Sequence, residues 1–336
     1  MPAAVNSQAQ AVLDKFAELG PLPTENLSPE NARNNPTLKN AVEQMAAESA
    51  MVRAMNVAMP AMPEPVGKIG HITIPTGDGE VIARVFTPKG DAPFPVLVYF
   101  HGGGFVIANL DVYESSCRAI CNAAECVVVS VAYRLAPENK FPAQIDDAYA
   151  ATQWVIQNAS SIGGDPNRVA IGGESAGGNL SAVTCLRARD EGGQMPIAQV
   201  LIYPLVDSSQ SQPSYTENAD AKPLNVPMMK WFFKHYLNGD EDLKNPYIAP
   251  LQSNDLSGLP PAIVITADSD PLRDEGEMYA KRLADAGVSV DAKRFDSTMH
   301  EFFGLAGAID EAADAVKLVA EGLKKVFEQR AAGSSN

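Results

Sequence analysis

A serine flanked by glycines is the residue with the clearest potential for covalent chemistry in this chain of 336 residues. Ser175 stands in the run Gly173-Glu174-Ser175-Ala176-Gly177, between a short apolar run and a segment of helical length. The pattern Gly-x-Ser-x-Gly between a strand and a helix is typical of a nucleophilic serine held on a tight turn. Such a turn also directs the N–H group of Ala176 outward near the start of the helix. The pattern therefore predicts that Ser175 is a nucleophile.

A phosphate-binding turn is the alternative interpretation of the same glycines, because glycine-rich turns between a strand and a helix also bind phosphate. A P-loop needs a lysine after its glycines, and no lysine follows here. Neither this segment nor Gly102-Gly103-Gly104 has the G-x-G-x-x-G spacing of a dinucleotide site. The nucleophile is therefore the favoured hypothesis.

A second glycine cluster, His101-Gly102-Gly103-Gly104-Phe105, follows another apolar run. Three consecutive glycines cost backbone entropy, and they leave bare N–H groups that can converge on one oxygen atom. Preorganised donors of this kind stabilise the oxyanion of an acyl-transfer reaction. A flexible turn at a strand end is the alternative, and the nearby serine motif argues against it. We interpret His101 as a residue that orders this loop.

A serine nucleophile needs a general base, and the sequence contains four histidines. His71 lies in a predicted hairpin strand and His235 lies in an aromatic helix, whereas His101 precedes the nucleophile. His300 follows the last predicted strand, so it is expected at the carboxyl edge of the sheet beside Ser175. We therefore predict that His300 is the base.

The base needs a carboxylate that orients its ring, and the loop after the preceding strand contains several acidic residues. Asp270, directly before Pro271, is the favoured candidate. Asp268 remains a close competitor, and Asp274 is expected to begin the next helix. The three predicted catalytic residues are therefore Ser175, His300 and Asp270.

Alternating strands and helices must position these residues, and the sequence shows that alternation from about residue 67 onward. A hairpin is predicted around Gly77-Asp78-Gly79. Short, continuous apolar runs then predict buried parallel strands, and segments of helical length separate most of them. The fold class is therefore α/β, a mostly parallel sheet flanked by helices. The strands are predicted at Val96–Phe100, Val127–Ala132, Arg168–Gly172, Gln199–Tyr203, Ala262–Thr266 and Val288–Phe295, and the helices at Asp111–Ala124, Ala143–Asn158, Ala176–Asp190, Asp274–Ala286 and Ala308–Gln329.

Two segments interrupt the alternation and predict a helical cap. Residues 1–65 have helical periodicity with a break rich in proline and asparagine, and residues 207–258 include an aromatic helix at Val226–Leu237. Such pieces could cover the carboxyl ends of the strands, where open α/β sheets bind ligands, or could merely cover a sheet edge. The core then comprises residues 66–206 and 259–330, and residues 331–336 form a frayed tail.

Composition excludes several function classes. The net charge is −15, from 26 basic and 41 acidic residues, so neither nucleic acid nor an anionic membrane is an expected partner. No apolar run reaches the length of a membrane span, and the N-terminus lacks a signal peptide, so we expect a cytoplasmic protein. Three of the four cysteines fall close together without a nearby histidine, and no metal site is expected.

Together these motifs resemble the hormone-sensitive-lipase-like branch of the α/β-hydrolases, also called bacterial esterase family IV. The chain order Ser175, Asp270, His300 is that of the α/β-hydrolases. The resemblance extends over nearly the whole chain and includes further motifs. In one of them we expect Arg134 and Glu138 to pair with each other. These motifs are Tyr133-Arg134-Leu135-Ala136-Pro137-Glu138, Phe141-Pro142-Ala143, Leu259-Pro260-Pro261-Ala262 and Asp270-Pro271-Leu272-Arg273-Asp274-Glu275-Gly276.

The resemblance implies a carboxylesterase for small-molecule esters with short to medium acyl chains, free of cofactors and often a homodimer. It implies oxyanion donors from the amides of Gly103, Gly104 and Ala176, and a cap in two parts. Two residues depart from the family pattern: Glu174, where one subgroup has aspartate, and Glu301, where many relatives have glycine. Both departures leave the catalytic residues in place.

The same residues also suit an amidase, or a hydrolase of lactones or carbamates, and a non-catalytic small-molecule receptor is a third hypothesis. Candidate pocket residues are Phe105, after the glycines, and Trp231, Phe232 and Tyr236 in the aromatic helix. Met51, Met55 and Met59 form a second apolar stripe at helical spacing. Both stripes could line the pocket or could pack the cap itself.

Overall fold

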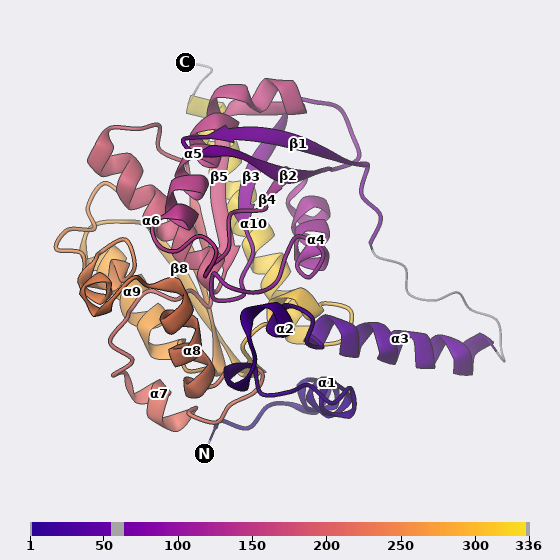
Figure 1. Cartoon of the computed structure of the whole chain (residues 1–336). Coiled ribbons are helices and arrows are strands. Elements are labelled where there is room, and N and C mark those ends of the chain that lie inside the picture. Colours follow the sequence, from indigo (N-terminus) through magenta and orange to yellow (C-terminus); the bar gives the residue numbers. More distant parts are fainter. Residues whose placement is uncertain (1, 55–63, 334–336) are drawn as a thin grey trace.

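An eight-stranded sheet forms the centre of the molecule in the computed structural model, which describes residues 2–54 and 64–333 (Figure 1). The strand order is β1-β2-β4-β3-β5-β6-β7-β8. The first two strands pair antiparallel with each other, β2 pairs antiparallel with β4, and all later pairs are parallel. The strands are β1 Lys68–Thr76, β2 Gly79–Thr87, β3 Phe94–Phe100, β4 Val127–Val131, β5 Gly164–Glu174, β6 Gln199–Ile202, β7 Ala262–Ser269 and β8 Val290–Met299.

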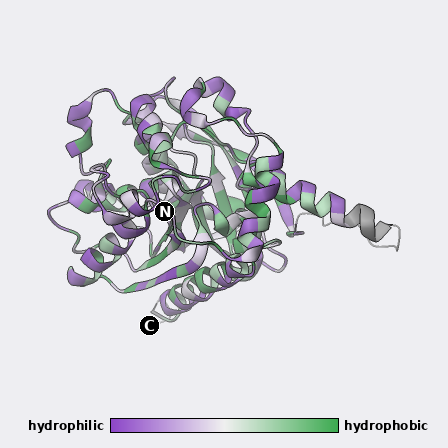
Figure 2. Ribbon diagram, turned by 90° about the horizontal axis from the view of Figure 1, so that it is seen from below, coloured by the Kyte–Doolittle hydropathy of each residue, from purple (hydrophilic) through white to green (hydrophobic). Residues whose placement is uncertain are grey.

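Helices cover both faces of this sheet. On one face, α5, α6 and α9 pack against the strands, and on the other face α4 and α10 do so, with α1 beside them. The central strands are apolar because both faces are covered: every residue of β4 is buried. Figure 2 shows the hydrophobic residues gathered around the sheet and the hydrophilic residues outside. The α-helices are α1 Ser7–Glu18, α2 Pro29–Arg33, α3 Leu38–Ala54, α4 Glu114–Ala124, α5 Ala143–Asn158, α6 Ala176–Glu191, α7 Pro213–Glu217, α8 Val226–Tyr236, α9 Arg273–Asp285 and α10 Asp310–Gly333, and the 3₁₀ helices are η1 Thr24–Asn26, η2 Ala159–Ile162, η3 Asp240–Lys244, η4 Pro250–Gln252 and η5 Phe302–Leu305.

The predicted α/β architecture is confirmed, with shifted boundaries. Helix α5 has the predicted bounds, whereas α4 begins three residues after the predicted start at Asp111. Strand β8 begins and ends later than predicted and reaches Met299, directly before His300. The extension begins with the polar residues Asp296, Ser297 and Thr298, so no apolar run marks it, although Thr298 and Met299 are buried.

The N-terminal segment and the insertion after β6 contact each other. The indole N–H of Trp231 in α8 donates a hydrogen bond to the carbonyl of Leu27 (3.1 Å). Arg33 of α2 donates to the carbonyls of Val106 (2.9 Å) and Ala136 (2.8 Å). These bonds hold both segments beside the loop that follows β3. Figure 1 shows α2, α7 and α8 at one end of the molecule.

Arg134 and Glu138 do not pair with each other, contrary to the expectation. Arg134 forms its close ion pair with the buried Asp147 (2.9 Å), and Glu138 pairs with Arg33 of α2 (2.7 Å). The two residues share one motif, but sequence proximity does not reveal the partners that α2 and α5 bring to them.

Part of one prediction lies outside the described residues. Met55 and Met59 fall in the segment 55–63, and the side chain of Met51 is likewise not described. Within residues 2–54 and 64–333, no helix is long and apolar enough to cross a membrane. The four cysteines are buried free thiols, and the same residues contain no cluster of side chains suited to a metal ion.

Candidate active site

Ser175 lies on the sharp turn between β5 and α6, in a strained backbone conformation. Its φ and ψ angles are 55° and −116°, a region that residues with a side chain rarely adopt. Glycines two positions before and after make this turn possible. A Cβ atom on Gly173 or Gly177 would collide with the carbonyl oxygen of Phe100 at the end of β3. The turn therefore presents the Ser175 hydroxyl at the carboxyl end of the sheet, where it is 8% exposed.

The three residues predicted to be catalytic form a continuous hydrogen-bonded chain. His300 follows β8, and its Nε2 atom lies 3.0 Å from the Ser175 Oγ. Asp270 follows β7, and its Oδ2 atom lies 2.6 Å from the His300 Nδ1. Both side chains are almost completely buried. The arrangement can transfer a proton from the serine hydroxyl to an imidazole whose other nitrogen is held by a carboxylate.

The competing carboxylates lie elsewhere. The second oxygen of Asp270 accepts a hydrogen bond from the Leu272 N–H (2.9 Å), which fixes the carboxylate in place. Asp268 instead faces Arg273 at 3.7 Å, and Asp274 accepts from the Ser214 N–H (2.8 Å). Geometry therefore favours Asp270 as the partner of His300.

Asn218 supports the Asp270 loop and was not anticipated from the sequence. Its side-chain amide donates to the carbonyls of Asp268 (3.2 Å) and Asp270 (3.0 Å). It is fully buried, in the insertion after β6. An isolated asparagine in a polar segment carries no sequence signal for this contact, because it forms only after the insertion folds back on the loop after β7.

The surroundings of His300 predict the acid side of the pH–rate profile. Burial lowers the pKa of the imidazole, but the charge of Asp270 and its hydrogen bond together raise it above the ordinary value of 6.5. A general base must be neutral, so activity is lost as pH falls through this raised pKa. We expect the acid limb of the kcat/KM profile to have its midpoint above pH 6.5. A midpoint at or below 6.5, measured with an ester substrate, would contradict this assignment.

Three amides are free near Ser175, two in the glycine loop after β3 and one at the start of α6. Gly103 and Gly104 have φ angles of 99° and 58°, which favour glycine. A Cβ atom on Gly104 would also collide with the ring of Phe232. Among the described residues, none accepts a hydrogen bond from the N–H groups of Gly103, Gly104 or Ala176. These donors remain available to an oxygen atom bound at Ser175.

His101 lies beneath this loop in an apolar environment. Its ring stacks on Tyr133, with the ring centres 4.4 Å apart, and its Nδ1 lies 2.7 Å from the Gly102 carbonyl. Burial lowers the pKa of His101 to about 4, so the imidazole is neutral at pH 7. These contacts suit the ordering role that we predict for it.

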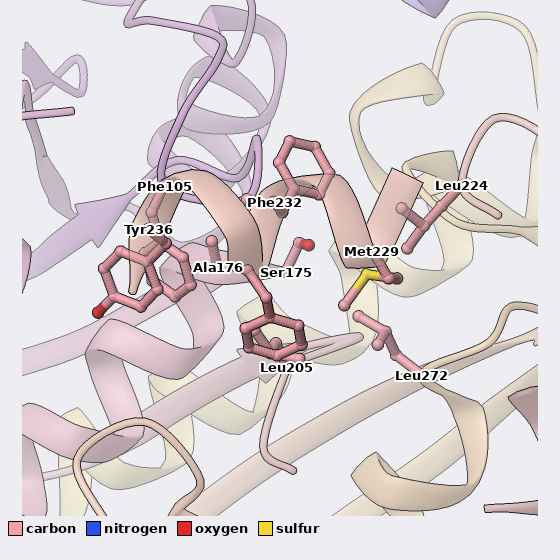
Figure 3. A pocket seen from close by; sticks show the side chains of 11 residues that line it. Phe105, Ser175, Ala176, Leu205, Leu224, Met229, Phe232, Tyr236 and Leu272 are labelled. Carbon is pink, nitrogen blue, oxygen red and sulfur yellow. The ribbon is translucent and has the colours of Figure 1, made fainter. Parts of the chain in front are cut away.

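Two cavities meet at Ser175. The smaller one, of about 20 Å³, is almost entirely apolar, and Figure 3 shows Ser175 among the side chains of Ala176, Leu205 and Met229 that line it. The larger one has a volume of about 360 Å³ and is open to solvent. It is lined by His300, by Gly103 and Gly104 of the loop after β3, and by residues of the N-terminal segment and of the insertion. Phe232 lines both cavities, as do Gly104, Ser175 and Leu224.

Three of the four predicted pocket residues line the smaller cavity: Phe105, Phe232 and Tyr236. Trp231 lies outside the described lining of both cavities. Its ring packs against His235, with the ring centres 4.5 Å apart, and its N–H is bonded to Leu27. Neighbouring residues of a helix point in directions about 100° apart, so one aromatic run serves both the pocket and the packing between segments.

The comparisons with known proteins agree with this fold. The chain belongs to the α/β-hydrolase fold family, which it matches over residues 97–304. Within that family it is a member of the hormone-sensitive-lipase-like branch. The carboxylic ester hydrolase LipN of Mycobacterium tuberculosis is 42% identical over 269 residues, which cover 78% of this chain and 71% of that protein.

Two further relatives extend the similarity. The ethyl acetate hydrolase of Pseudomonas putida is 34% identical over 263 residues, 76% of this chain and 82% of that protein. The hyperthermophilic esterase of Pyrobaculum calidifontis has a similar structure, with a TM-score of 0.83 and 38% identity over 97% of this chain and 99% of that chain. The similarity therefore includes the N-terminal segment and the insertion as well as the core.

Proposed function

We propose that this chain is a serine carboxylesterase that uses Ser175, His300 and Asp270 to hydrolyse esters of short- to medium-chain acids. The chain is a carboxylic ester hydrolase, as its relatives support. The observation that carries the finer assignment is the continuous chain of hydrogen bonds from Asp270 through His300 to Ser175.

In the first step, His300 accepts the proton of the Ser175 hydroxyl through Nε2 while Ser175 Oγ attacks the ester carbonyl carbon. Asp270 keeps the Nδ1 atom protonated and stabilises the imidazolium that forms. The tetrahedral intermediate then collapses as His300 returns the proton to the leaving alcohol. An acyl group remains bound to Ser175.

The amides of Gly103, Gly104 and Ala176 stabilise the oxyanion of this intermediate. They have no other acceptor among the described residues, so no internal hydrogen bond has to be broken when the negative charge develops. In the second step, His300 takes a proton from water, the water oxygen attacks the acyl carbonyl, and the acid is released as the proton returns to Ser175.

The two cavities suggest where the acyl part and the alcohol part of the ester bind. The acyl chain occupies the small apolar cavity beside Ala176, and the alcohol occupies the larger open cavity beneath the N-terminal segment. A cavity of about 20 Å³ has room for little more than one water molecule, so even a short acyl chain requires neighbouring side chains to move, and a long chain requires more movement. Methionine and leucine side chains in its lining allow modest adaptation to longer acyl groups.

A panel of chromogenic acyl esters of increasing chain length tests this function. We expect kcat/KM to peak at short chains, and a fluorophosphonate to inactivate the protein by modifying Ser175, as peptide mass mapping would show. Faster turnover of amides, lactones or carbamates than of esters would show that the proposed substrate class is wrong. Tight binding of a small molecule without hydrolysis would favour the receptor hypothesis.

Replacing Phe232 by alanine is expected to broaden the acyl-chain range, because its ring lines both cavities and its removal enlarges the space beside Ser175. We expect kcat/KM for long-chain esters to rise about 10-fold relative to short-chain esters. Trp231→Phe is the matched control, since Trp231 lies on the same helix outside the described lining of both cavities, and its chain-length profile should remain that of the wild type. An unchanged profile in Phe232→Ala would show that another residue limits the acyl chain.

A further inference from the structure

Glu174, the residue before Ser175, lies in a buried polar cluster that the proposed catalytic steps do not use. Its carboxylate is fully buried and has no cationic partner among the described residues. Each of its two oxygens accepts a hydrogen bond from a different tyrosine: Tyr99 donates to one and Tyr203 to the other. We call these three residues the Glu174 cluster.

The sheet explains why one carboxylate can reach both tyrosines. Glu174 is the last residue of β5, which lies between β3 and β6. Tyr99 of β3 pairs with Gly172, and Gly172 shares a sheet face with Glu174 because side chains alternate along a strand. On the other side, Glu174 pairs with Ile202, directly before Tyr203. The carboxylate therefore joins three adjacent strands near their carboxyl ends, where the proposed catalytic residues also lie.

Tyr203 connects this cluster to the catalytic histidine. The centre of its ring lies 4.6 Å from the centre of the His300 ring, with an angle of 50° between the two planes. The φ angle of Tyr203 is 35°, a left-handed value that costs free energy for a residue with a side chain. Its N–H group is held by the carbonyl of Ile265 (2.6 Å). The surrounding structure therefore imposes the orientation of this phenol ring against His300.

We propose that Glu174 and Tyr203 are positioning residues for His300: the carboxylate fixes the phenol, and the phenol ring fixes the imidazole between Asp270 and Ser175. This inference rests on the proposed function of His300. The hydrogen bond that His300 donates to Asp270 leaves the imidazole free to rotate about that bond, whereas the Tyr203 ring restricts the rotation. A catalytic group misplaced by about 1 Å can lose two orders of magnitude in rate, so this support has kinetic consequences.

The length of the Glu174 side chain is part of this arrangement. An aspartate would withdraw the carboxylate by one methylene from the two hydroxyls that Glu174 joins. Burial raises the pKa of Glu174, while hydrogen bonds from hydroxyl groups, including those of Tyr203 and Tyr99, act in the opposite direction. The two phenols therefore compensate for the absence of a cation beside a buried acid.

The chain offers a matched pair of variants for the test. Tyr99→Phe and Tyr203→Phe each remove one hydrogen bond to Glu174, so both should lower the melting temperature by similar amounts. Among the aromatic rings that the structure describes, only Tyr203 lies against His300. We expect Tyr203→Phe to lower kcat about 10-fold with little change in KM. The fall in kcat for Tyr99→Phe should be about twofold or less.

Glu174→Gln supplies the second arm. It should lower kcat about as much as Tyr203→Phe does, and the double variant should be no slower than the slower single variant, because both changes break one connection. Losses that multiply in the double variant, or equal kcat losses in Tyr99→Phe and Tyr203→Phe, would overturn the proposal. A raised KM with unchanged kcat in Tyr203→Phe would overturn it as well.

The proton between His300 and Asp270 gives a readout that does not depend on turnover. Its downfield proton resonance should shift or broaden in Tyr203→Phe and remain unchanged in Tyr99→Phe. If the wild type hydrolyses no ester, the proposed function fails while this resonance still tests the positioning. If the wild type hydrolyses esters and the resonance and kcat of Tyr203→Phe match the wild type, the positioning fails alone.

Discussion

Replacing Ser175 by alanine is expected to lower kcat for ester hydrolysis by about 10⁶-fold, the scale seen when a serine nucleophile is removed. Alanine lacks the oxygen that attacks the carbonyl. Among the described lining of the two cavities, the other hydroxyl or thiol side chains are Thr24 and Thr37 of the N-terminal segment, and neither has a hydrogen bond to His300. The variant should bind substrate with similar affinity, because the cavities and the free amides are unchanged.

Folding should be little affected in Ser175→Ala, because the strained turn depends on Gly173 and Gly177 and the serine loses only its bond to His300. Ser181→Ala on the same helix is a matched control: it removes a buried hydroxyl that bonds the Gly177 carbonyl (2.8 Å), and it should retain most of the activity. A Ser175→Ala protein that retains more than about 1% of the wild-type kcat would contradict the nucleophile assignment.

Asp270→Asn is expected to lower kcat by about 10⁴-fold without disrupting the fold. An asparagine can present its N–H₂ group to the His300 Nδ1, which then becomes the unprotonated nitrogen. The proton would sit on Nε2, so the imidazole could no longer accept the proton of Ser175. The effect would thus come from the wrong tautomer of His300.

Asp268→Asn distinguishes the two carboxylates of this loop. Asp268 is half-buried and faces Arg273, which also pairs with Glu217 (2.6 Å) and Asp274 (2.8 Å). Removing one of these charges leaves Arg273 with two partners, so we expect less than about a threefold change in kcat. A large loss in Asp268→Asn beside an active Asp270→Asn would reverse the assignment.

Much of the core could be predicted because buried parallel strands and amphipathic helices leave local patterns. Helix α5 has the predicted bounds, and β4 was recognisable because four of its five residues are valine. The order of the strands in the sheet has no such local signature. Likewise, β8 continues past Phe295 to Met299 through polar residues, since one side of an edge strand faces solvent.

The residues of the candidate site divide in the same way, into those that a local sequence pattern marks and those that it does not. That Ser175, Asp270 and His300 lie together could be predicted, because a glycine pattern marks the serine and the loops after parallel strands all lie at the carboxyl edge of the sheet. The support from Asn218 and the contact of Tyr203 with His300 depend on segments that meet only in three dimensions. Trp231 was assigned to the pocket because helical periodicity identifies an aromatic run but not which of two neighbouring surfaces each ring faces.

The way the chain distributes its proposed catalytic residues also governs when activity can emerge during folding. Ser175 and His300 are 125 positions apart, and Asp270 and His300 are 30 apart. They follow β5, β7 and β8, so they meet only once non-local parallel pairings have formed from β5 to β8. Such pairings form slowly because long loops must close first. During refolding, ester hydrolysis is therefore expected to return late, after most of the circular dichroism signal of the helices has returned.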